Sequence, residues 1–143
     1  MATVFYGVYE PASGRLIASS AGHLPPVFAP PDGPPRLAQI ECDVPIGVAD
    51  EPDRDSTVLD LAPGALLCCY TDGLVERRDK PLDAGMDRLA EVLGKVLADP
   101  ASAVGGTMAE KSCNAVMREL AGGVAANDDI AVVTMYHHQL EAG

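Results

Sequence analysis

Residues 65–70, with the sequence ALLCCY, restrict the fold of this chain more than any other segment. Side chains along a β-strand alternate between its two faces, and in this strand both faces are apolar. Such a strand has to be covered on both sides. A second apolar run, residues 130–136 with the sequence IAVVTMY, predicts another central strand. Two such strands suggest two sheets stacked face to face with helices outside them.

Further strands are predicted in the N-terminal half. Residues 3–9 and 16–22 are predicted to form a hairpin, and another strand precedes the turn at residues 63–64. The proline-rich stretch 25–35 predicts a tight turn whose flanking strands lie at a sheet edge. Strands therefore come first along the chain.

Helices are predicted between the two apolar strands. Apolar residues recur at helical spacing over residues 83–97 and again over residues 100–120. The expected buried stripe of the second helix consists of Val104, Met108, Cys113, Val116, Met117 and Leu120. Strands, two helices and a last strand predict an α+β fold of two stacked antiparallel β-sheets flanked by helices. At 143 residues, the chain is expected to form one domain.

The charge of the chain limits its partners. It has 21 acidic and 10 basic residues, a formal net charge of −11. This charge repels a nucleic-acid backbone and no basic cluster is visible in the sequence, so nucleic acid is not expected as a partner. No apolar stretch approaches the roughly 20 residues of a membrane span, and the four cysteines are interpreted as reduced residues of a cytoplasmic protein. A phosphorylated substrate would also be repelled unless a bound cation reversed the local charge.

Aspartates lie at one end of each apolar strand. Asp72 follows the first strand, where Gly73 lets the chain turn, and Asp128 and Asp129 precede the second. If these strands are antiparallel neighbours, Asp72 meets Asp128 in space. Carboxylate oxygens are the ligands that Mg²⁺ and Mn²⁺ prefer. The spacing alone leaves a metal site and ordinary turn chemistry both open.

Three segments follow one another in the order FYGVYEPASGRLIASSAGHLPPV, LAPGALLCCYTDGLVERRD and NDDIAVV. Together they resemble the bacterial SpoIIE-like serine phosphatases, which belong to the metal-dependent (PPM, type 2C-like) protein phosphatases. The resemblance covers nearly the whole chain and implies the same sandwich of two sheets. It also implies a pair of Mn²⁺ or Mg²⁺ ions in the complete family domain, with Asp72 and Asp128 as ligands of one ion. Asp129, Gly73 and His23 are further candidates near that metal.

The resemblance also implies an activity and a partner. In this family a metal-activated water hydrolyses phosphoserine or phosphothreonine on a protein, without a phosphoenzyme. The usual substrates are phosphorylated anti-sigma-factor antagonists, which act in bacterial signalling. The expected function is therefore that of a protein serine/threonine phosphatase acting on a regulatory protein.

One family segment is missing from the sequence. The family has an upstream Gly-Asp pair whose aspartate bridges both metals. We therefore expect residues 1–143 to be the C-terminal portion of a phosphatase domain that binds at most one ion, weakly, and has little activity. A non-catalytic module of the same fold that binds a regulatory protein is the alternative. Exposed sheet edges left by the missing segment would favour a homo-oligomer.

Two other chemistries are weaker matches. Aspartyl-nucleophile phosphohydrolases also place Asp-Gly after an apolar strand, with the nucleophilic aspartate two residues before the second one. Tyr70 occupies that position here, which excludes this class. No histidine can be paired with Cys68 or Cys69 from the sequence, so a thiol nucleophile is unsupported.

Overall fold

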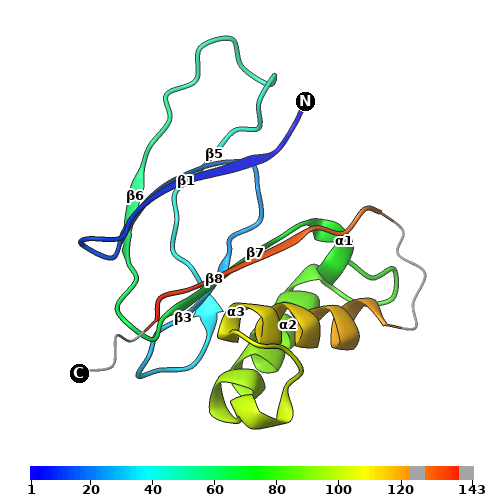
Figure 1. Cartoon of the computed structure of the whole chain (residues 1–143). Helices are drawn as coiled ribbons and strands as arrows, with labels where there is room; N and C mark the ends of the chain where they lie inside the picture. The colour runs from blue at the N-terminus through cyan, green and yellow to red at the C-terminus, as the bar shows by residue number, and fades with distance from the viewer. Residues whose placement is uncertain (123–127, 139–143) are drawn as a thin grey trace.

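The computed structural model describes residues 1–122 and 128–138, and these form two four-stranded β-sheets with helices packed against one of them (Figure 1). Sheet one comprises β1 (Val4–Glu10), β2 (Arg15–Ala21), β5 (Cys42–Asp43) and β6 (Thr57–Asp60). Sheet two has the strand order β4 (Arg36–Leu37), β3 (Val27–Ala29), β7 (Leu66–Tyr70) and β8 (Val132–Tyr136). Neighbouring strands are antiparallel except for the β2–β5 pair. The predicted α+β class with two stacked, largely antiparallel sheets is confirmed.

Strand β7 is buried on both faces, as its sequence predicts. Leu66, Cys68 and Tyr70 face a core formed with the helices. Leu67 and Cys69 face a second core, which also contains residues of sheet one. Full burial of one leucine side chain contributes roughly 1.5–3 kcal/mol, so these alternating contacts hold β7 firmly between two layers.

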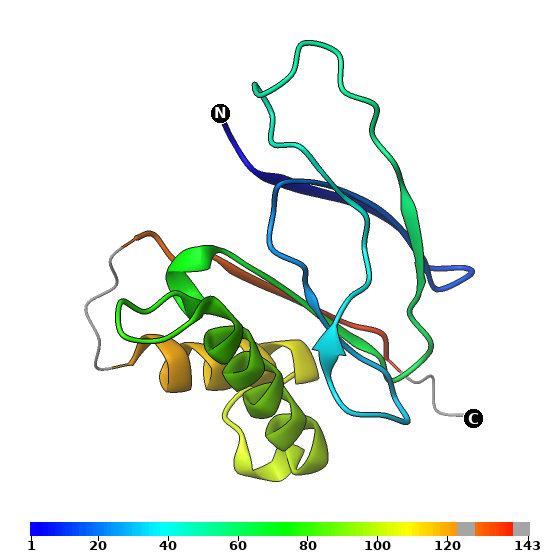
Figure 2. The same cartoon turned by 180° about the vertical axis from the view of Figure 1, so that it is seen from behind.

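The helical part of the chain follows β7. It consists of α1 (Asp72–Val75), α2 (Leu82–Ala98), the 3₁₀ turn η1 (Pro100–Ser102), α3 (Met108–Val116) and the π-helical turn η2 (Met117–Ala121). Helix α2 confirms the helix predicted over residues 83–97. Figure 2 shows from behind that α2 and α3 lie on the far side of sheet two from sheet one. None of the helices in the described part of the chain is long and apolar enough to cross a membrane.

The prediction of one helix over residues 100–120 is wrong. Helix α3 begins only after Thr107, whose side chain accepts from the Glu110 N–H while the Glu110 carboxylate accepts from the Thr107 N–H. This capping box fixes the start of the helix. Gly105, two residues earlier, has φ of +143°, a value that other residues rarely adopt.

The buried stripe predicted for this region is only partly correct. Val116 and Leu120 are buried, as expected. Val104 is 70% exposed because it lies outside α3, and Met117 is 37% exposed where the chain changes to a π-helical turn. Cys113 is only half-buried. A helical register drawn through all of residues 100–120 therefore misplaces residues on either side of the true helix.

The prediction that β8 is a central strand is wrong, because β8 is the last strand of sheet two among the described strands. It pairs with β7 alone and Val133 is 66% exposed, so β8 lies at an edge of sheet two. The turn at residues 25–35 is flanked by β4, which is an edge strand as predicted, and by β3, which lies inside the sheet. Apolar content indicates which faces are buried and leaves the number of strand neighbours open.

The outer face of sheet one is apolar and bare of other described residues. Val8 lies opposite Ile17, which lies opposite Val58, and all three are exposed. Tyr6 and Val4 continue the same face at 65% and 39% exposure. Strand β1 pairs with β2 on one side and has no other strand partner within residues 1–122 and 128–138.

The self-association expected from the sequence stays a prediction, now directed at this face. A lysine at position 6 must remain hydrated, so Tyr6→Lys should shift the chain toward the monomer. Met117→Lys, a matched change on η2, should leave the assembly unchanged. Light scattering over a wide concentration range measures both variants. A wild-type chain that is monomeric throughout that range contradicts the prediction.

Helix α2 packs closely on the end of α1 through Gly85. A Cβ atom at Gly85 would overlap the Val75 carbonyl oxygen, whereas one at Gly94 in the same helix meets only Pro35 Cδ at 3.4 Å. Gly85→Ala should lower the free energy of unfolding by about 1–3 kcal/mol. Gly94→Ala should raise it by up to about 1 kcal/mol, because it removes a glycine from a helix interior. Urea unfolding measures both, and equal stabilities for the two variants would refute this packing.

Candidate metal centre

The β7–β8 ladder ends in the two segments that carry the predicted aspartates. Tyr70 pairs with Val132, and beyond this pair the Thr71 N–H donates to the Ala131 carbonyl oxygen at 3.1 Å. Figure 1 shows α1, which Asp72 begins, beside the chain that enters β8. The structure therefore brings the segments around Asp72 and Asp128 together at the same end of the fold.

Thr71 and Gly73 hold these two segments together. The Thr71 hydroxyl donates to the Asp129 carbonyl oxygen at 3.1 Å and accepts from the Ala131 N–H at 2.9 Å. At Gly73, a Cβ atom would overlap the Asp129 carbonyl oxygen and lie 2.9 Å from that of Asp128. Glycine is required at position 73 because two backbone segments approach each other closely there.

A cleft of about 220 Å³ opens at this end and is lined by Gly73, Glu76, Arg78 and Asp128. Asp72, Asp128 and Asp129 are exposed, and the Asp128 carboxylate accepts the Asp129 N–H at 2.8 Å. Asn127, the first residue of the NDD motif, lies outside the described residues. Glu76 and Arg78 were not assigned to the site from the sequence. The sequence signal that could have pointed to them is the run of charged residues that follows Asp72.

The carboxylates that line this cleft are those of Glu76 and Asp128, beside the guanidinium of Arg78. Within residues 1–122 and 128–138, no three His, Cys, Asp or Glu side chains are grouped so that they could hold a metal ion. Mg²⁺ commonly binds through one or two carboxylates and keeps several waters. Asp128 lines the cleft, whereas Asp72 is exposed next to Gly73 and is not among the lining residues. A cation here would therefore keep most of its waters.

His23 supports the end of β7 and does not line the cleft. Its Nε2 is hydrogen-bonded to the Tyr70 carbonyl oxygen at 3.1 Å, and its Nδ1 lies 3.3 Å from the Thr3 hydroxyl. The Tyr70 hydroxyl donates to the Pro25 carbonyl oxygen at 2.8 Å. His23 thereby connects sheet one with the residue two positions before Asp72.

The cysteines of β7 are unsuited to act as nucleophiles. Burial, together with the nearby Cys69 and Cys113, raises the pKa of the Cys68 thiol to about 12. Burial likewise raises the pKa of Cys69 to about 11. Thiolates are the reactive form, so both residues are inert near neutral pH and act in packing.

Comparison with solved structures finds proteins that have the same fold as this chain. The RsbU and RsbW domains of Rv1364c from Mycobacterium tuberculosis superpose with a TM-score of 0.78 and 26% identity, over 95% of this chain and 37% of that one. The phosphatase domain of the cell fate determinant SpoIIE from Bacillus subtilis, in a Mn-presoaked structure, gives 0.61 and 18%, over 99% and 59%. A structure of that PP2C phosphatase domain with a fragment of the regulatory domain gives 0.64 and 19%, over 92% and 37%. The chain thus spans less than two thirds of each of them.

These similarities show that the chain has the α+β fold of the phosphatase domains with which it superposes. A family model, Stage II sporulation protein E (SpoIIE), matches residues 1–138. The chain belongs to the SpoIIE family.

The close approach at Gly73 leads to a test of the site's geometry. Gly73→Ala should push the 128–131 segment away from α1 and lower the free energy of unfolding by about 1–3 kcal/mol. Hydrogen exchange should then speed up at the Ala131 amide, whose N–H is bonded to Thr71. Gly94→Ala is the control and should leave this amide protected. Unchanged exchange at Ala131 in Gly73→Ala would contradict the proposed packing.

Proposed function

We propose that the chain contributes Asp72 and Asp128 to the divalent-metal site of a protein serine/threonine phosphatase. The observation that carries the proposal is the packing of the segment at Thr71 and Gly73 against residues 128–131 in a chain of the SpoIIE family. This packing supports the proposal because it brings the two aspartate-bearing segments into contact beside the cleft that Gly73 and Asp128 line. Exposure of both aspartates keeps their oxygens open to a cation and to water.

Mn²⁺ or Mg²⁺ bound by these aspartates would supply a water of lowered pKa and a positive charge against the substrate phosphate. Asp72 and Asp128 would hold the ion, and Gly73 keeps the two segments close enough to share it. Asp129 is the neighbouring carboxylate available to support them. Arg78 lines the same cleft, where its guanidinium can donate to phosphate oxygens in the fork geometry that suits them. Such local positive charge is needed because the chain carries a net charge of −11.

The expected activity of this chain is low. Residues 1–122 and 128–138 contain no group of three metal-ligating side chains. A site with two protein carboxylates is expected to bind one ion weakly, and a complete two-ion centre would require donors from elsewhere. Hydrolysis of a phosphoserine peptide should therefore be slow even with Mn²⁺ present.

The proposed substrate is a phosphorylated regulatory protein of the anti-sigma-factor antagonist type. Support comes from the family itself and from the similar Mycobacterium tuberculosis protein, which contains RsbU and RsbW domains. A non-catalytic module that binds such a protein is the second candidate function. The same lack of a three-residue metal group among the described side chains favours it.

Metal binding separates these two candidates. Asp72→Asn and Asp128→Asn should each weaken Mn²⁺ binding at least about tenfold, because each removes a charged ligand from a site that has few. Asp60→Asn, an exposed aspartate at the end of β6, is the matched control and should bind Mn²⁺ as the wild type does. Isothermal titration measures all four proteins. Equal binding in all of them rules out the metal assignment and favours the non-catalytic module.

A further inference from the structure

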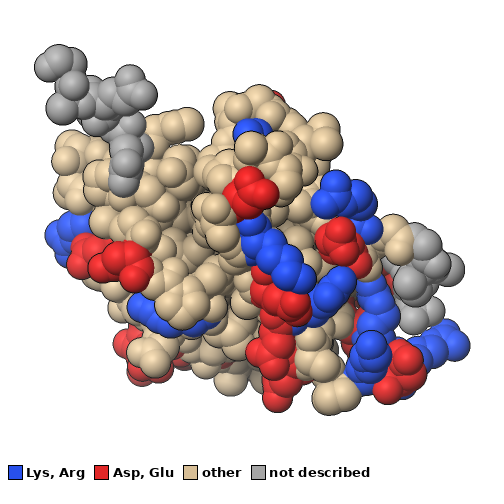
Figure 3. Space-filling model, turned by 90° about the horizontal axis from the view of Figure 1, so that it is seen from below, with Lys and Arg blue, Asp and Glu red and all other residues tan. Residues whose placement is uncertain are grey.

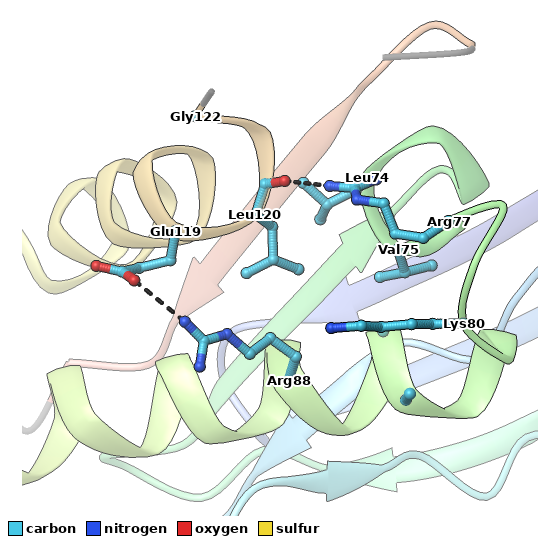
Figure 4. A pocket seen from close by; sticks show the side chains of 10 residues that line it. Leu74, Val75, Arg77, Lys80, Arg88, Glu119, Leu120 and Gly122 are labelled. Atoms are coloured by element: carbon cyan, nitrogen blue, oxygen red, sulfur yellow. Dashed lines mark hydrogen bonds and ion pairs between the residues drawn. The ribbon is translucent and has the colours of Figure 1, made fainter. Parts of the chain in front are cut away.

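A second cavity, of about 250 Å³, lies between α1, α2 and η2 (Figure 4). Arg77 and Lys80 line it, whereas Glu76 and Arg78 line the cleft at Asp128. Residues of one short segment, 76–80, therefore face two different cavities. Whatever occupies the second cavity lies next to the segment that leads away from Asp72.

The cavity combines an apolar floor with a rim of three cations and one carboxylate, which are Arg77, Lys80, Arg88 and Glu119. This cationic rim has a net positive charge. Leu74, Val75 and Leu120 form part of its floor and are each at most 5% exposed. Figure 4 shows the Lys80 side chain extended between those of Arg77 and Arg88. The sequence showed no basic cluster because Arg88 joins the others only through the folding of α2 against α1.

The positive charge of the rim is only partly neutralised. Arg77 donates to the carbonyl oxygens of Glu76 and Leu120, which carry no net charge. Arg88 contacts Glu119 at 3.3 Å and Glu91 at 3.8 Å. Both carboxylates are shared with another cation, because Glu119 also contacts Arg118 at 3.4 Å and Glu91 also contacts Lys95 at 2.8 Å. The ion pairs among the described residues do not include Lys80.

Structural roles explain these cations only in part. Arg77 satisfies a carbonyl at the end of the helical segment that closes with η2, where a cation is favourable. The Arg88–Glu119 contact is an exposed ion pair, which adds little to stability. Neither role requires Lys80 at the same cavity. On a chain with a net charge of −11, three cations at one cavity are an unusual local feature. Figure 3 shows that Lys and Arg side chains on this side of the molecule are interspersed with Asp and Glu side chains.

The size of the cavity indicates what it can hold. Small-molecule sites usually enclose about 300–1,000 Å³, so a cavity of about 250 Å³ suits one or two side chains better than a whole ligand. Its cationic rim is complementary to a carboxylate, and its floor is complementary to an aliphatic side chain. A protein segment that carries an acidic residue close to an apolar one satisfies both requirements.

We infer that this cavity is a docking site for an acidic segment of the protein substrate. A carboxylate of that segment lies beside Lys80 and Arg88, and an apolar side chain covers Leu74 and Leu120. The identity of the occupant as substrate rests on the proposed phosphatase function. The docking itself needs no metal, because none of the residues that line the cavity is a proposed ligand.

The test uses a short fluorescent peptide that alternates glutamate and leucine, at low salt and with a chelator present. Fluorescence anisotropy should show binding to the wild-type chain and much weaker binding of the matching peptide with glutamine in place of glutamate. Lys80→Gln should weaken binding of the acidic peptide about fivefold, since one charge-assisted contact is lost. Lys95 lies on α2 beside Glu91 and does not line this cavity. Lys95→Gln removes the same charge as Lys80→Gln and should bind the peptide as the wild type does.

Three results would overturn this inference. They are equal affinity of Lys80→Gln and Lys95→Gln, equal binding of the two peptides, and binding of sodium phosphate at this cavity without binding of the acidic peptide. Asp72→Asn separates the inference from the proposed function, because it should keep the peptide affinity of the wild type. A chain that binds the peptide but no Mn²⁺ retains the docking site and loses the phosphatase assignment. A chain that binds Mn²⁺ but not the peptide does the opposite.

Discussion

The burial of β7 on both faces is the constraint on which the rest of the structure depends. Its alternating side chains enter two separate cores, one shared with the helices and one shared with sheet one. Moving this strand would open both cores at once, and a slip by one residue would exchange its two faces. The register and place of β7 are therefore fixed, and this also fixes where the residues that follow it begin. Asp72 comes two residues after its end.

The placement of Asp128 follows from the same constraint by a different route. The β7–β8 ladder aligns Tyr70 with Val132, and the side chain of Thr71 extends that ladder by two hydrogen bonds. Gly73 then lets the backbone at residues 128–129 approach α1 more closely than any other residue would. The packing of β7, its pairing with β8 and the lack of a side chain at Gly73 together determine the shape of the cleft.

The sequence pattern predicted the elements whose formation depends mainly on neighbouring residues. The hairpin pattern identified β1 and β2, the continuous apolar run identified β7, and helical spacing identified α2. It failed over residues 100–107, where the valine at position 104 suited the pattern but the capping box at Thr107 determined the start of α3. It also misplaced β8, because the number of neighbours of a strand depends on tertiary pairing. At the candidate site, the TDG and NDD motifs pointed to two segments that the structure brings together, whereas the position of Arg78 at the cleft depends on the path of the chain after α1.

Both cavities are lined by basic side chains from a chain that is acidic as a whole. The chain has 10 lysine and arginine residues, and Arg77, Arg78, Lys80 and Arg88 line one or other of the cavities beside the turn after α1. An acidic protein repels an acidic or phosphorylated partner over most of its surface, so attraction has to be concentrated where binding is productive. Arg77 and Arg78 are adjacent in the sequence but line different cavities, which reduces the repulsion between their charges. The proposed charge recognition and the proposed metal binding would then depend on different residues, those on the turn and those at the strand ends.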